Sequence, residues 1–190
     1  MLRAWTPSVM ARMSAKNSSR RGFTLVELLA VVAMVGILAA LAIVGYRRYL
    51  SASKTSGARA IMGAIRAAQE SYRAETLAYL SCSSHLQDYY PASPDGNRRH
   101  WLNPSHADSN CWKILNVTTD APTSFGFAVV AGQPGAKPPS PSTQSKPTWP
   151  KTTEPWFVIQ AAGDDDSDGQ RSLLLTSSFS GEFYVENESE

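Results

Sequence analysis

The hydrophobic residues of this chain are concentrated in one unbroken run near the N-terminus. Residues 23–46 read FTLVELLAVVAMVGILAALAIVGY and contain a single charged residue, Glu27. As an α-helix this run is about 36 Å long, which exceeds the roughly 30 Å hydrocarbon core of a bilayer. The apolar core of a secretory signal is shorter, about 7–15 residues, and its cleavage site follows the run. The pattern therefore predicts a membrane-spanning helix.

After this run the pattern becomes amphipathic but stays helical. Apolar residues recur at spacings of three and four at Ala58, Ile61, Ile65, Ala68 and Tyr72, and no proline interrupts residues 23–90. This spacing predicts one helix over 23–76, with one apolar stripe along its second part. Because isolated helices gain most of their stability from tertiary burial, that stripe must pack on another part of the chain.

The C-terminal half shows shorter apolar runs, at 125–131, 156–162, 171–177 and 182–186. Gly, Pro, Asp and Ser bound these runs, which is typical of an antiparallel meander. Between the first two runs, residues 133–155 contain seven prolines, which predicts an exposed, partly extended loop. Residues 78–123 show no regular pattern. The expected fold class is α+β, with the long N-terminal helix packed on a small antiparallel sheet.

Charge is distributed unevenly along the chain. The net charge is +2, but the first 22 residues carry five basic residues and no acidic one: Arg3, Arg12, Lys16, Arg20 and Arg21. The positive-inside rule keeps such a segment in the cytoplasm, and Arg47 and Arg48 at the other end do not outweigh it. The C-terminal part is therefore expected outside the cytoplasm.

The chain has two cysteines, Cys82 and Cys111, and neither lies in a CxxC or Cys/His motif. On the export side of a membrane such a pair favours one disulfide. Two free, buried thiols are the alternative.

Glu27 is unusual because a charge inside a membrane helix costs about 2.5–3.5 kcal/mol at the centre and less near the ends. The helix dipole at the N-terminus makes a carboxylate tolerable there but does not explain its presence. If the chain is cut between Gly22 and Phe23, a new α-amino group appears four residues before Glu27. The amine and the carboxylate would then pair, either within one helix or between neighbouring helices.

Residues 20–29, Arg20-Arg21-Gly22-Phe23-Thr24-Leu25-Val26-Glu27-Leu28-Leu29, followed by the apolar run, resemble the class III signal of type IV pilins and pseudopilins. The resemblance covers about residues 20–50, including Gly36, Tyr46 and Tyr49, whereas Val44 stands where many members have proline. It implies that a membrane prepilin peptidase cuts after Gly22 and N-methylates Phe23, and it places Glu27 at the family's acidic position.

This resemblance implies a cleaved leader (1–22), a transmembrane and assembly helix (23–46), its amphipathic continuation (47–76) and a globular pilin-like domain (77–190). The expected function is structural: a pilin of a type IV pilus, with a minor pilin favoured. The alternatives are a pseudopilin of type II secretion and a membrane-anchored DNA- or surface-binding module. The expected location is the inner membrane with a periplasmic domain, and then a filament or pseudopilus. Other pilin subunits are the expected partners, and no catalytic constellation indicates an enzyme.

An acidic segment is the main candidate for a ligand site. Asp164, Asp166 and Asp168, followed by Gly169, match the first half of a D-x-D-x-D-G calcium loop. Leu175 stands at the twelfth position, where such loops have a bidentate glutamate. Some pseudopilins bind calcium in a C-terminal loop, so calcium is a possible cofactor. An acidic hairpin turn is the alternative.

Two further features are expected to be ordinary surface. Residues 97–101 (NRRHW) form a small basic and aromatic patch, but a solvated loop is favoured over a nucleic-acid site. The three histidines, His85, His100 and His106, show no metal-ligand spacing. They are therefore expected to be ordinary surface histidines.

Overall fold

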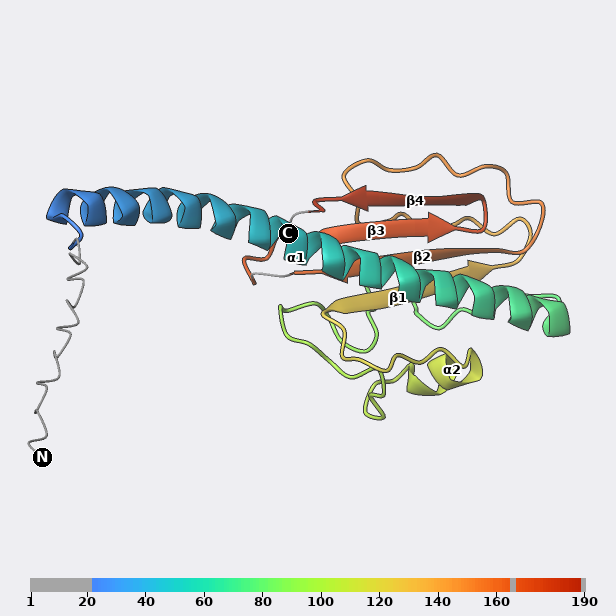
Figure 1. The fold of residues 1–190 in the computed structure, drawn as a ribbon. Coiled ribbons are helices and arrows are strands. Elements are labelled where there is room, and N and C mark those ends of the chain that lie inside the picture. The colour runs from blue at the N-terminus through green and yellow to red at the C-terminus, as the bar shows by residue number, and fades with distance from the viewer. Residues whose placement is uncertain (1–21, 165–166, 189–190) are drawn as a thin grey trace, which may run out of the picture. The chain divides into compact units, whose positions relative to one another are not determined.

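The computed structural model describes residues 22–164 and 167–188. Its helices are α1 (Leu25–Thr76) and α2 (Ser109–Ile114), and its strands are β1 (Phe125–Gly132), β2 (Trp156–Gly163), β3 (Ser172–Ser177) and β4 (Ser180–Glu186) (Figure 1). The chain divides between Ala42 and Ile43 into two compact units.

The four strands form one antiparallel sheet in the order β1-β2-β3-β4, so each strand pairs with its neighbour in sequence. In the centre, Ile159 of β2 lies opposite Val129 of β1 and Thr176 of β3. The last pair is less regular, because its register shifts between Leu175 and Ser177 of β3. The predicted meander and the predicted α+β class are both confirmed.

Within the second unit, α1 presents one narrow buried seam to the sheet. The seam residues recur at alternating spacings of four and three: Ser51, Thr55, Ala58, Met62, Ile65 and Gln69. The predicted stripe included Ala58 and Ile65, but its other members, Ile61, Ala68 and Tyr72, are only partly buried. Apolar character alone misplaced the stripe because polar side chains occupy three positions of the seam.

Gln69 shows why a polar residue fits there. Its amide nitrogen donates to the Leu80 carbonyl at 2.6 Å, and its amide oxygen accepts from the Leu80 N–H at 2.9 Å. The buried amide is therefore satisfied on both sides and leaves no unpaired polar group in the core.

The sheet face toward α1 forms the main hydrophobic core. Phe127 and Val129 of β1 and Phe157 of β2 pack in one buried cluster with Met62 and Ile65. Because successive strand residues point to opposite faces, the intervening residues form a second layer. Trp156, Val158 and Leu175 pack there with Leu86, and every residue of β2 is buried.

The proline-rich segment 133–155 helps to cover this second face. Pro138, Pro141 and Thr143 within it are buried. The buried Gln160 side chain holds it, with its amide oxygen accepting from the Ser142 N–H at 2.9 Å. The expectation of an exposed loop is therefore wrong for this part, because an apolar second sheet face needs cover.

Candidate functional site

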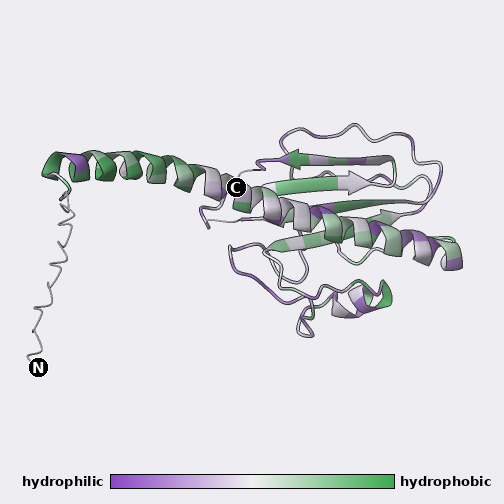
Figure 2. Cartoon of the chain, in the orientation of Figure 1, coloured by the Kyte–Doolittle hydropathy of each residue, from purple (hydrophilic) through white to green (hydrophobic). Residues whose placement is uncertain are grey.

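The N-terminal part of α1 is an uncovered apolar surface. Every described residue from Gly22 to Ala42 is exposed, and Figure 2 shows this stretch as almost continuously hydrophobic. The helix is long and apolar enough to cross a membrane, and its most apolar stretch has no buried residue. A core helix of a soluble protein would be mostly buried. This stretch therefore needs lipid or other protein chains to cover it.

The expected cleavage site precedes this helix. Gly22, Phe23 and Thr24 lie outside the helix, and the Phe23 side chain is 80% exposed. Apart from its two chain neighbours, no described residue has an atom within 4 Å of the position that a Cβ at Gly22 would occupy. The Gly22–Phe23 peptide bond is thus in non-helical, accessible chain, as a peptidase substrate must be.

Glu27 caps the start of the helix together with Thr24. Its Oε2 accepts from the Thr24 N–H at 2.9 Å and from the Thr24 hydroxyl at 2.7 Å, while its own N–H donates to Thr24 Oγ1 at 3.2 Å. This reciprocal arrangement is a capping box. The T-x-x-E spacing of residues 24–27 is its sequence signal, which the interpretation from charge alone missed.

The capping box also places Glu27 next to the N-terminus that a cut after Gly22 would create. After a cut at Gly22, the new amine on Phe23 would be one residue from the Thr24 N–H that already contacts Oε2. The Oε1 atom takes part in neither of the two bonds. The carboxylate of the uncut chain is therefore satisfied within its own helix and has a second oxygen for another donor.

Cys82 and Cys111 form a disulfide, with their Cα atoms 5.3 Å apart. This confirms the predicted pairing. The bond joins the segment after α1 to α2.

The basic patch at residues 97–101 does not present its aromatic ring. Trp101 is 3% exposed and packs edge-on against Trp112, with ring centroids 5.3 Å apart. Arg99 pairs with Asp95 at 2.6 Å, and this hydrogen bond lowers the pKa of the Asp95 carboxyl. The buried ring is therefore unavailable for stacking on a nucleic-acid base.

The acids of the proposed calcium loop differ in environment. Asp164 directly follows β2 and is 5% exposed, and its Oδ1 has no hydrogen-bond partner within the described part of the chain. Asp168 is exposed and accepts from the Gln170 N–H at 2.7 Å. Asp166 lies outside the described residues. Calcium binding here stays a prediction.

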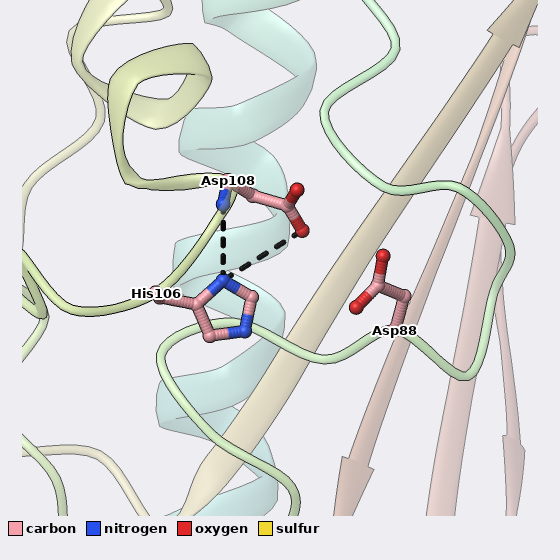
Figure 3. Close-up of side chains that lie close together, drawn as sticks. All are labelled: Asp88, His106 and Asp108. Carbon is pink, nitrogen blue, oxygen red and sulfur yellow. Dashed lines mark hydrogen bonds and ion pairs between the residues drawn. The ribbon is translucent and has the colours of Figure 1, made fainter.

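A second acidic group includes a histidine. Asp88, His106 and Asp108 each offer one ligand atom, and these three atoms lie within 4.8 Å of one another (Figure 3). Burial, followed by the charge of Asp88, raises the pKa of the Asp108 carboxyl. The His106 side chain is only 19% exposed, so the expectation of an ordinary surface histidine is wrong for His106. The sequence did not reveal this group because Asp88 is far along the chain from His106 and Asp108.

Comparison with known proteins agrees with the N-terminal features. A family model described as the prokaryotic N-terminal methylation motif matches residues 17–43. The type IV major pilin protein PilA of Myxococcus xanthus is 35% identical over 100 residues, covering 53% of this chain and 44% of PilA. The type IV major fimbrial protein FimA of Dichelobacter nodosus is 46% identical over 54 residues, covering 28% of this chain and 35% of FimA.

The chain thus spans less than half the length of these relatives, and no solved structure is significantly similar to it. The motif match covers the Gly22–Phe23 signal and most of the exposed apolar helix. The relatives are pilins and fimbrial proteins, which are structural proteins and not enzymes. The chain thus carries a prepilin-type N-terminal signal and is similar to type IV pilins.

Proposed function

We propose that the chain is a pilin of a type IV pilus, cut after Gly22, N-methylated at Phe23 and assembled through the N-terminal part of α1. The observation that carries this proposal is the fully exposed apolar helix directly after the Arg21-Gly22-Phe23 signal. Such a surface is stable only in lipid or against other apolar helices, so one segment serves first as anchor and then as assembly surface.

The proposed partners follow from this sequence of events. The basic leader keeps the cleavage site on the cytoplasmic side of the inner membrane. A prepilin peptidase therefore cuts the chain on that side. The unit that follows residue 42 then lies in the periplasm, a compartment in which the Cys82–Cys111 disulfide is stable. Assembly brings the amine of one Phe23 to a Glu27 carboxylate of its own or a neighbouring helix.

A pilus is favoured over a secretion pseudopilus because the relatives are named as pilins and fimbrial proteins. The DNA-binding module is disfavoured because the ring of Trp101 is buried. Whether the subunit is a major or a minor pilin follows from its abundance in sheared filaments.

Mass spectrometry of the mature protein tests the proposal. The expected N-terminus is N-methylated Phe23, and Gly22→Val should leave the leader attached because the residue before the cut must be small. The control is Ser19→Val, which should be processed normally. A mature N-terminus at another residue, or a cut after residue 46, would contradict the proposal.

A further inference from the structure

We propose that Asp88, His106 and Asp108 bind one divalent transition-metal ion, for which Zn²⁺ fits best. The proposal concerns a site in the unit after residue 42 and does not depend on the pilin function. All three ligands lie on the chain that connects α1 and α2. Asp88 is in the first part of this connection, and His106 and Asp108 are at its end, just before α2. The proposed role is a cross-link between these segments.

The spacing of the three ligand atoms suits one ion. Metal–nitrogen and metal–oxygen bonds of Zn²⁺ are about 2.0–2.2 Å long, so its ligand atoms lie roughly 3–4 Å apart. His106 Nδ1 and Asp108 Oδ2 are 3.7 Å apart. Figure 3 shows the carboxylate of Asp88 facing that of Asp108, beside the histidine ring. One imidazole with two carboxylates suits Zn²⁺ better than the all-oxygen preference of Ca²⁺.

Outer hydrogen bonds orient two of the ligands. His106 Nε2 lies 3.2 Å from the Tyr89 carbonyl oxygen, which as an N–H···O bond directs the Nδ1 lone pair towards the two carboxylates. Asp88 Oδ2 accepts from the N–H and the hydroxyl of Ser84, both at 3.1 Å. Metal-binding histidines and carboxylates are commonly held by such contacts, with the histidine donating its other N–H to a carbonyl.

Asp108 supplies an independent observation. It occupies the N-cap position of α2 but makes no side-chain cap hydrogen bond. Its Oδ2 is buried without a hydrogen-bond partner among the described residues, and it faces a second carboxylate. A buried carboxylate oxygen without a hydrogen-bond partner is unfavourable. A cation between the two acids would give this oxygen a partner and would offset the repulsion between the two carboxylates.

One existing contact must give way. The Asp108 N–H donates to His106 Nδ1 at 3.2 Å, which is at the long end for such a bond. A metal ion at Nδ1 would replace this contact. The resulting cross-link would join nearly the same segments as the Cys82–Cys111 disulfide.

Metal titration of the full-length chain tests the proposal. The untagged protein in detergent micelles, first treated with chelator and dialysed, is titrated with ZnCl₂, and Co²⁺ serves as a spectroscopic probe. We expect one bound ion per chain and a Tm higher by about 5–10 °C at a hundredfold excess over Kd. His106→Gln and Asp108→Asn should lose both effects, and the control His85→Gln should keep both.

Three results would overturn the proposal. They are no stoichiometric binding by the unaltered chain, unchanged binding by His106→Gln, or a higher Tm of metal-free Asp108→Asn with no response of the unaltered chain to Zn²⁺. The last result would mean that the two carboxylates repel each other and that no metal ion relieves the repulsion. If circular dichroism shows that His106→Gln does not fold, Asp88→Asn, altered at a partly exposed position, decides in its place.

Discussion

Helix α1 contains two stretches that differ in how their side chains are buried. Residues 25–42 are apolar on nearly all sides and exposed throughout, whereas residues 51–76 bury one seam and leave their other faces partly or fully exposed. A helix that is apolar all round has no preferred side and suits lipid or a bundle of copies, while one seam suits a single sheet face. The first stretch should therefore govern assembly and the second the stability of the folded unit, so substitutions should separate the two properties.

Glu27→Val should produce the largest effect, on assembly alone. The change removes a charge that is costly in the membrane, so insertion is retained or improved. Incorporation into filaments should fall at least tenfold, because the incoming Phe23 amine loses its partner. Immunoblots of sheared filaments and of membranes measure both quantities. Normal filament incorporation would contradict the assembly role of Glu27.

Ile65→Ala should produce the largest effect on folding. Ile65 is fully buried on the seam, and truncation of such a residue costs about 2–5 kcal/mol, which lowers the Tm by about 5–15 °C. The matched control is Leu38→Ala in the first stretch, where the side chain is 65% exposed and the Tm should not change. Thermal melts of both variants in detergent measure the two Tm shifts. Equal shifts would contradict the proposed difference between the two stretches of α1.

Loss of the disulfide should also destabilise only the second unit. In the chain-entropy model, closing a loop of this length contributes about 3–4 kcal/mol. The double variant Cys82→Ser, Cys111→Ser should therefore unfold at lower denaturant while its membrane insertion stays normal. In the unaltered protein, denatured without a reductant, titration should find no free thiols. Free thiols in that sample would refute the pairing.

Calcium should give the smallest effect. If Asp164, Asp166 and Asp168 bind Ca²⁺, a hundredfold excess over Kd stabilises the folded chain by about 2.7 kcal/mol. The Tm in millimolar calcium should then exceed that in chelator, and Asp166→Ala, Asp168→Ala should abolish the difference. Asp120→Ala, at an exposed acid elsewhere, is the control. Equal melting of the unaltered chain in both conditions would leave an ordinary acidic turn.

The sheet could be predicted from the sequence because each strand corresponds to a local apolar run. The runs at 125–131 and 156–162 end within one residue of β1 and β2, since turn residues bound them and neighbours in sequence pair. The seam of α1 was predicted less well. Gln69 is buried because of a partner at Leu80, and no helical periodicity reveals such a partner.

The sequence by itself determined the signal at Gly22–Phe23, the apolar helix and the sheet order, because each depends on consecutive residues or on neighbouring segments. Only the tertiary structure decided that Gln160 anchors the proline-rich segment and that Asp88 meets His106 and Asp108. These contacts join residues far apart in the chain. Their partners follow from which apolar surfaces the fold must cover, and that is a property of the whole packed unit.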